Sequence, residues 1–243
     1  AKKINEAIRE PFSLSEKNVY ISVSIGLAVY PDDAANTTDL IKYADQAMYN
    51  AKINGKDTFS YFSKEMQSKA ILRSELSSDI YIALKEQQLS MHYQPIIDLQ
   101  TNQMVKAEAL IRWNHPVKGF INPQVFIGIS EETGSIDALG NWITDTVINQ
   151  LATWRRTYDT DIGVTINMSP IQFLNKENNQ KIREKIKELL IPEDKVILEI
   201  TESVLLDDNE IVSNEISLYD KANIGIAVDD FGTGYSSLSY LKK

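Results

Sequence analysis

Apolar residues recur in two different periods along the first part of the chain. Residues 20–31, YISVSIGLAVYP, alternate in character and end in a Pro-Asp-Asp turn, which is typical of a β-strand. From residue 40 to 51, apolar side chains return at helical spacing after a polar cluster, and this pattern predicts an amphipathic helix that Gly55 closes. Residues 57–62 are expected to form a short strand, and residues 63–88 a long connecting helix.

From residue 91 onward, apolar runs alternate with amphipathic stretches. Strands are expected at residues 92–99, 104–113, 163–169, 195–201 and 224–230. Helices are expected at residues 123–132, 137–158, 178–190 and 209–222. Repeated βα units with such apolar strands predict a parallel sheet covered on both faces. An eight-stranded (β/α) barrel takes about 250 residues, so the expected fold is an α/β, TIM-like barrel that is truncated after its fifth strand.

The composition narrows the class of protein. The chain has 243 residues, with 25 basic and 34 acidic side chains and a formal net charge of -9. This balance argues against binding of polymeric nucleic acid. The absence of cysteine excludes disulfides and thiolate metal sites.

The N-terminus and the lengths of the apolar runs predict the cellular location of this segment. No run reaches the length that spans a bilayer, and the N-terminus lacks the apolar core of a signal peptide. We therefore expect a cytoplasmic segment without membrane contact, with any membrane anchor of a parent protein lying elsewhere. A chain that begins at Ala1 is expected to be a piece of a longer protein.

Four of the expected strands each carry one oxygen-bearing side chain near the carboxyl end. These residues are Glu108, Asn167, Glu199 and Asp229, and Asp230 follows the last of them. In a barrel the C-terminal ends of the strands converge on the mouth, where active sites lie. An all-oxygen set suits a hard cation such as Mg²⁺ or Mn²⁺. Two ions that share Asp229, with Asp230 serving the second, would also relieve the repulsion between these adjacent carboxylates.

Taken singly, most of these residues also have a structural interpretation. Asp229 and Asp230 could cap the following helix. Glu108 could form an ion pair with Arg112, which shares its strand face. Asn167 could be an ordinary buried amide. Only the joint placement on successive strand ends favours a metal site.

Two further observations concern Glu199 and Glu202, whose structural interpretations are not equally plausible. Glu199 is hard to explain structurally, because an unpaired carboxylate buried in an apolar strand is costly. Glu202 is expected just past the end of that strand, where it could cap a helix or brace a loop.

Five long motifs follow one another along the second part of the chain. They are YQPI at 93–96, KAEALIRW at 106–113, INMSP at 166–170, LEITES at 198–203 and DDFGTGYSSLSYL at 229–241. This series resembles the EAL-domain cyclic di-GMP phosphodiesterases, a family that carries the name of the triplet found here at 108–110. The family hydrolyses cyclic di-GMP to linear pGpG through attack by a water that two Mg²⁺ or Mn²⁺ ions activate. The resemblance implies the same activity, with cyclic di-GMP as partner.

The resemblance also implies roles for single residues. The four strand-end residues would be metal ligands, and Asp230 would serve the second ion. Glu202 would hold the loop after Asp230, and Gln94 and Arg112 would contact the substrate. The family further uses a lysine, a glutamate and a glutamine that would lie beyond Lys243, so the chain by itself is expected to be inactive.

The first part of the chain is similar to a different module. The motifs VSIGLAVYP at 23–31, YADQAMYNAK at 43–52 and NGKD at 54–57 resemble the C-terminal half of a GGDEF, or diguanylate cyclase, domain. The motif that names that family is absent, so cyclase activity is not expected. The expected organisation is a partial GGDEF-like domain over residues 1–62, a linker helix over 63–71 and the N-terminal part of an EAL domain over 72–243.

Two further functional hypotheses stay open beside the phosphodiesterase. One is a non-catalytic receptor or regulatory domain that binds cyclic di-GMP, and the other is a metalloenzyme for a different phosphodiester. The complete set of ligands favours the phosphodiesterase, because a receptor that never cleaves has no need of every ligand. A homodimer through the EAL domain is also among the expectations.

Overall fold

The computed structural model divides into two compact units, Ala1–Leu76 and Ser77–Lys243. It describes residues 1–14, 17–206, 210–229 and 232. Within these residues, no helix combines the length and the apolar character that crossing a membrane requires.

The N-terminal unit pairs short strands with one long helix. Its elements are α1 (Lys2–Arg9), β1 (Phe12–Leu14), β2 (Lys17–Val19), β3 (Ile25–Leu27), α2 (Thr37–Ile53) and β4 (Phe59–Tyr61). Strand β1 pairs antiparallel with β2, and β3 pairs parallel with β4. Gly26 lets β3 approach α2 closely, since a Cβ there would lie 1.9 Å from the carbonyl oxygen of Ala44.

The expectation of one strand over residues 20–31 is wrong for most of that range. Only Ile25–Leu27 forms a strand, because β4 offers hydrogen-bonding partners to just these three residues. The predicted helix is confirmed as α2. It begins after Asn36, whose side chain accepts a hydrogen bond from the backbone N–H of Asp39, and Gly55 follows its end with a φ of 106°. The long connecting helix is confirmed as α3 (Lys64–Lys85).

The C-terminal unit is built on one sheet with the strand order β10-β9-β8-β6-β5. The strands are β5 (Leu89–Asp98), β6 (Gln103–His115), β8 (Gly163–Met168), β9 (Val196–Thr201) and β10 (Gly225–Asp229), and β7 (Gly119–Ile121) pairs with β6. All five expected strands are therefore confirmed. Strands β6, β8, β9 and β10 run parallel.

Strand β5 corrects the expectation of an all-parallel sheet, because it runs antiparallel to β6. The two strands are joined by a short turn, and a parallel pair would need a much longer crossover. The turn is held by Asp98, whose carboxylate accepts hydrogen bonds from the backbone N–H groups of Gln100 and Thr101 at 2.9 and 2.8 Å.

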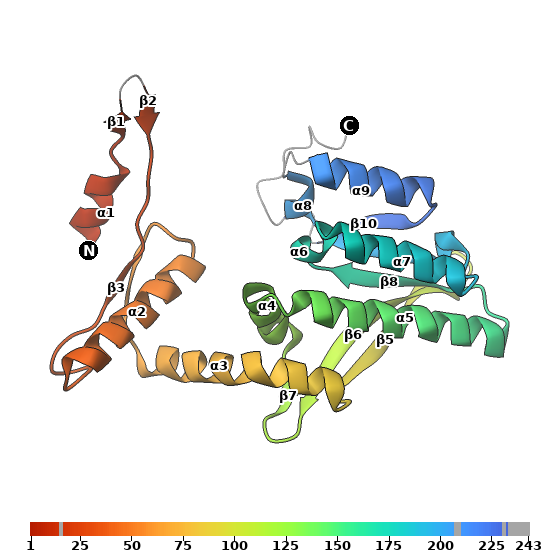
Figure 1. Ribbon diagram of the computed structural model, residues 1–243, viewed down its shortest axis with the longest axis horizontal. Helices are drawn as coiled ribbons and strands as arrows, with labels where there is room; N and C mark the ends of the chain where they lie inside the picture. The colour runs from red at the N-terminus through yellow and green to blue at the C-terminus, as the bar shows by residue number, and fades with distance from the viewer. Residues whose placement is uncertain (15–16, 207–209, 230–231, 233–243) are drawn as a thin grey trace. The chain divides into compact units, whose positions relative to one another are not determined.

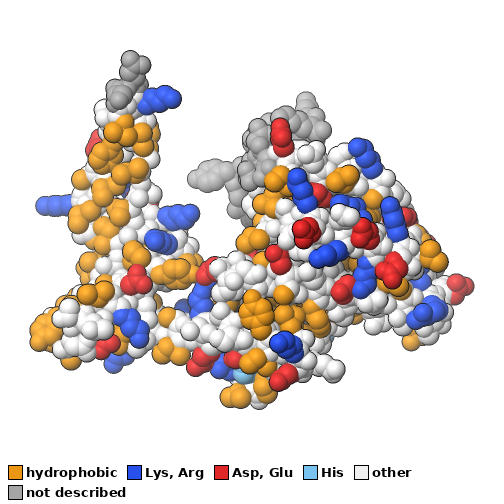
Figure 2. Space-filling model, viewed as in Figure 1, with side chains coloured by type: hydrophobic (Ala, Val, Ile, Leu, Met, Phe, Trp, Pro, Cys, Tyr) orange, Lys and Arg blue, Asp and Glu red, His pale blue; other side chains and the backbone are white. Residues whose placement is uncertain are grey.

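The helices of this unit confirm the predicted βα alternation. They are α4 (Pro123–Thr133), α5 (Ile136–Tyr158), α6 (Pro170–Phe173), α7 (Lys176–Glu188), α8 (Glu202–Leu206) and α9 (Glu210–Lys221), with a 3-10 turn at Glu193–Lys195. Helices α5, α7 and α9 lie side by side along the sheet (Figure 1). Their outer surface carries interspersed acidic and basic side chains (Figure 2).

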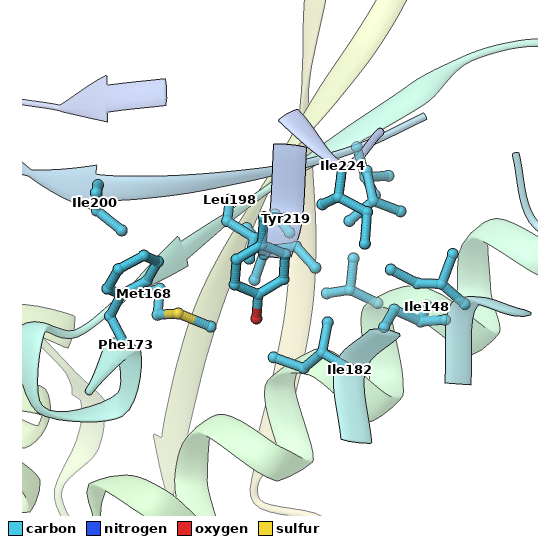
Figure 3. Close-up of a cluster of buried hydrophobic side chains, with 14 of the residues drawn as sticks. Ile148, Met168, Phe173, Ile182, Leu198, Ile200, Tyr219 and Ile224 are labelled. Carbon is cyan, nitrogen blue, oxygen red and sulfur yellow. The ribbon is translucent and has the colours of Figure 1, made fainter. Parts of the chain in front are cut away.

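The core fills the space between the sheet and these helices. Tyr219 of α9 is fully buried there, and its ring lies near Leu198, Ile148 and Ile182 (Figure 3). Its ring also stacks on Phe173, with 6.1 Å between the ring centroids. The helices thereby fix one face of the sheet.

The opposite face of the sheet stays partly exposed in the described part of the chain, which corrects the expectation of cover on both faces. In β6, Ala107 and Ala109 are buried against the helical layer. Lys106, Glu108 and Arg112 alternate with them and are only partly buried. This second face is rich in polar groups and holds the candidate site.

Candidate functional site

The strand register brings the candidate ligands to neighbouring positions on one face. Asn167 of β8 lies directly opposite Glu199 of β9. Glu108 of β6 is opposite Thr165, two residues before Asn167, and Asp229 of β10 is two residues beyond the position opposite Glu199. An offset of two residues keeps side chains on the same face of a sheet. The four strands thus present their oxygen-bearing side chains together.

A direct contact joins two of these residues across neighbouring strands. The Nδ2 of Asn167 donates a hydrogen bond to Oε1 of Glu108 at 3.0 Å, although 59 positions separate them in sequence. Asn167 is exposed and therefore not the ordinary buried amide of the structural interpretation. Arg112 does not pair with Glu108 here, since its Nη1 donates to the carbonyl oxygen of Ile111 at 2.8 Å.

The pKa of Glu199 depends on its burial and on the charges of the other carboxylates. Burial raises the pKa of Glu199 above its usual range, and the negative charges of Glu108 and Asp229 raise it further. The nearby hydroxyl of Thr165 and the charge of Lys106 act in the opposite direction. A carboxylate that is difficult to ionise because it is partly buried and lies near other negative charges is one that a bound cation would stabilise strongly.

The donor chemistry of this face fits a hard divalent cation. Among the residues that the structure describes, no three histidine, cysteine, aspartate or glutamate side chains already form a metal-binding group. The expected set, however, includes the amide of Asn167, and Asp230 lies outside the described residues. Crowded carboxylates beside an amide are the oxygen donors that Mg²⁺ and Mn²⁺ prefer.

Glu202 connects the end of β9 to the segment that follows β10. It is the first residue of α8, and its Oε2 accepts a hydrogen bond from the backbone N–H of Gly232 at 3.1 Å. Gly232 has a φ of 90°, a conformation that favours glycine. Of the two interpretations that the sequence left open, a helix cap and a loop brace, the contact with Gly232 agrees with the loop brace, and Glu202 is the first residue of α8 rather than its cap.

The two expected substrate contacts lie on the same face as the ligands. Gln94 of β5 is exposed and lies opposite Glu108. Arg112 is partly buried and follows Glu108 by four residues along β6. A carboxamide and a guanidinium at these positions flank the carboxylates, where both can donate hydrogen bonds to an anion.

Sequence reasoning missed a support directly behind Asn167. Ser169 caps α6 in a reciprocal capping box with Gln172, and its Oγ donates to Oε1 of Glu131 at 2.6 Å. These contacts fix the turn that follows Asn167. The signal in the sequence was the run SPIQ at the end of a strand, a capping-box pattern with proline at the first helical position.

The fold and this face define a (β/α)-barrel type of unit with an oxygen-rich site at its strand ends. The family model for the EAL domain matches residues 77–243, and the chain belongs to the EAL-domain family. The model for the diguanylate cyclase, or GGDEF, domain matches residues 1–58. The resemblance inferred from the motifs is thereby confirmed.

Several known proteins are similar to this chain over its whole length. The bifunctional diguanylate cyclase/cyclic di-GMP phosphodiesterase MucR of Pseudomonas aeruginosa is 35% identical over 100% of the chain and 36% of the relative. The cyclic di-GMP phosphodiesterase PdeR of Escherichia coli is also 35% identical, with the same coverage of 100% and 36%. The chain thus spans about a third of the length of these curated relatives.

Solved structures agree with this assignment. The PaMucR phosphodiesterase in complex with c-di-GMP has a TM-score of 0.65 and 35% identity, with 69% of this chain and 68% of that chain covered. The EAL enzyme Bd1971, bound to cAMP and cyclic di-GMP, has a TM-score of 0.65 and 28% identity over 71% of this chain and 48% of its own. These similarities confirm the expected α/β fold of the EAL type.

Proposed function

We propose that the protein hydrolyses cyclic di-GMP to linear pGpG with the help of divalent metal ions. The observation that carries this proposal is the shared face of Glu108, Asn167, Glu199 and Asp229, in which a hydrogen bond joins two members and the charges of three are coupled. Membership in the EAL-domain family and similarity to proteins described as cyclic di-GMP phosphodiesterases support the same activity.

The proposed ligand set consists of the four residues on this face together with Asp230. These residues would hold two ions, Mg²⁺ or Mn²⁺. Bound divalent ions lower the pKa of water and stabilise charge on phosphoryl oxygens. Glu202 has a positioning role in this proposal, because its contact with Gly232 ties β9 to the segment that includes Asp230.

Gln94 and Arg112 are proposed to hold the substrate. A guanidinium binds phosphate oxygens through paired N–H donors, and its charge does not depend on pH in the physiological range. The position of Arg112 beyond Glu108, toward the carboxyl end of β6, is where a barrel presents its substrate. Gln94 would donate to the same ligand from the neighbouring strand.

The proposal also covers the location, the partners and the domain limits of the protein. We propose a cytoplasmic location, no binding of polymeric nucleic acid, no membrane contact of this segment and a homodimer through the EAL domain. The proposed domain limits are 1–62 for the GGDEF-like part, 63–71 for the linker and 72–243 for the EAL part. Mixed charges over the helical surface agree with a partner that is small rather than polymeric (Figure 2).

Hydrolysis of cyclic di-GMP by the full-length protein tests the function. Chromatography of the products should show pGpG with Mg²⁺ or Mn²⁺, and EDTA should abolish its formation. Glu108→Ala is expected to lower the turnover by at least about a hundredfold, as the loss of a group that stabilises the transition state does. Glu188→Ala, an exposed glutamate at the end of α7, serves as the control and should leave turnover unchanged.

The outcomes separate the candidate functions. Unchanged turnover in Glu108→Ala would reject the ligand role of that residue. Tight binding of cyclic di-GMP without cleavage in the full-length protein would favour the receptor. A protein that neither binds nor cleaves cyclic di-GMP, but hydrolyses another phosphodiester, would favour a different metalloenzyme.

A further inference from the structure

Lys106 lies on the same face of the sheet as the proposed ligands. It precedes Glu108 by two residues in β6, and the buried Ala107 between them points to the helical layer. The residue opposite Lys106 on β8 is Gly163, where a Cβ would lie 3.0 Å from the carbonyl oxygen of Lys195, so no side chain separates Lys106 from that strand. A flexible cationic side chain is thereby placed next to a group of carboxylates.

The charge of Lys106 acts on that group. Lys106 and Glu108 lie on one face of the same strand with about 7 Å between their Cα atoms, so the lysine charge is within range of that carboxylate. A lysine side chain is about as long as two residues of a strand, so the ammonium group of Lys106 is able to extend to the level of Glu108. Arg112 is the other cation on this face of β6, and it lies four residues beyond Glu108, on the opposite side of the carboxylates from Lys106.

The position of Lys106 shows whether it is placed to bind the substrate or to act on the carboxylates. A lysine that holds the substrate would lie toward the carboxyl ends of the strands, beyond the ligands. Lys106 lies on the other side, toward the amino end of β6 and beneath Glu108. Its place in the strand is therefore on the amino-terminal side of the carboxylates, away from the side that receives the substrate.

We propose that Lys106 sets the affinity of the site for divalent cations. Without an ion, its positive charge balances part of the repulsion among Glu108, Glu199 and Asp229. With an ion bound, the same charge repels the cation and weakens its binding. This inference rests on the proposed function, because it assumes that these carboxylates bind the metal.

Titration of the full-length protein with Mn²⁺ alone tests the inference. The dissociation constant follows from calorimetry or from the electron paramagnetic resonance of free Mn²⁺. Lys106→Met keeps the aliphatic stem and removes the charge, and it should bind Mn²⁺ about thirty times more tightly, which is the effect of one charge on a divalent ion at about 8 Å when the effective dielectric constant is about 40. Lys106→Gln should change the affinity in the same direction.

Two controls separate local charge from other effects. Lys106→Arg keeps the charge and should bind Mn²⁺ as the wild type does. Lys187→Met removes one positive charge from an exposed position on α7, so it has the same net charge as Lys106→Met and should leave the Mn²⁺ affinity unchanged.

Thermal unfolding gives a second readout that a merely structural role would not produce. In EDTA, Lys106→Met should unfold at a lower temperature than the wild type, because its carboxylates lose their counter-charge. Mn²⁺ should then raise its midpoint by more than it raises that of the wild type. A mutation that only damages packing would lower the midpoint in both conditions.

The results distinguish failure of this inference from failure of the proposed function. Equal or weaker Mn²⁺ binding by Lys106→Met and Lys106→Gln, beside a wild type that binds Mn²⁺, would overturn the role of Lys106 alone. A wild type that binds no Mn²⁺ would overturn the proposed metal site, and this inference with it.

Discussion

Replacing Glu199 with glutamine should stabilise the metal-free protein at neutral pH. The pKa of Glu199 is raised in the folded state, first by burial and then by the charges of Glu108 and Asp229. Because the folded pKa lies above the unfolded one, the folded state is favoured at low pH and loses that advantage as the pH rises through the folded pKa. Glutamine keeps the shape of the side chain and has no charge to lose.

The expected gain follows from the register of the strands. Asp229 is offset by two residues on the strand next to Glu199, which places their Cα atoms about 8 Å apart. Two unit charges at about 8 Å repel each other by about 1 kcal/mol when the effective dielectric constant is about 40, between the values for a protein surface and for water. Glu108 adds a similar repulsion, and the hydroxyl of Thr165 together with the charge of Lys106 offsets part of the sum. The net gain is about 1 kcal/mol, or a rise of about 2–4 °C in the unfolding midpoint.

Thermal unfolding followed by circular dichroism measures this gain. In EDTA at pH 8, Glu199→Gln should unfold at a higher temperature than the wild type, and at pH 4 the difference should largely disappear because the raised pKa of Glu199 leaves its carboxyl group mostly protonated there. Mn²⁺ should raise the unfolding midpoint of the wild type, because a bound ion stabilises the unit that holds the site. The transition that shifts with Mn²⁺ therefore belongs to that unit. Glu188→Gln, on the exposed surface of α7, is the matched control.

Two results would refute the electrostatic reasoning. The first is a midpoint for Glu199→Gln below that of the wild type in EDTA at pH 8. The second is a gain of the same size at pH 4, since a stabilisation without pH dependence would have to come from packing rather than from charge.

Three more predictions concern groups outside the site. Arg183→Met should destabilise the protein by about 3 kcal/mol in urea unfolding, because the buried carboxylate of Glu215, now 2.9 Å from the guanidinium, would lose its partner; changing both residues to methionine should cost much less. Burial raises the pKa of Tyr93 to about 12, so its phenol should ionise about two pH units later than exposed tyrosines in an absorbance titration, and the stability that it contributes should be lost between about pH 10 and about 12. Gly140→Ala should lower the unfolding midpoint, because the added Cβ would lie 1.2 Å from Nε2 of Gln172, and an unchanged midpoint would show that this side chain has another place to go.

The elements that could be predicted from the sequence are those with a strong local period. Helix α2 follows its cap at Asn36, and the long α5 follows its apolar spacing almost to the residue. The strand expected over residues 20–31 failed for the opposite reason. Alternation describes a chain that can pair, but the pairing itself depends on β4, more than thirty positions away in sequence for each paired residue.

The direction of β5 is encoded locally in the sequence. The turn that Asp98 closes is too short for a crossover, so an antiparallel pair was the only arrangement that it allows. The βα alternation that predicts parallel strands in the rest of the sheet does not apply to β5 and β6, because no helix lies between them.

The candidate site divides in the same way. That Asn167 and Glu199 share a face follows from alternation along their strands, and the sequence predicts it. The hydrogen bond between Asn167 and Glu108 and the support of Ser169 by Glu131 depend on rotamers and on distant elements, which no local pattern encodes. The roles of Gln94 and of the other site residues stay predictions.

The contact between Asn167 and Glu108 has a consequence for how the site fills. A carboxamide has a donating end and an accepting end, and here the donating end faces the carboxylate. A cation held between the two side chains needs the accepting end, so loading would require the amide to rotate by half a turn. The side-chain amide resonances of Asn167 in nuclear magnetic resonance would then shift when a metal ion binds. They would report metal binding without substrate and without turnover.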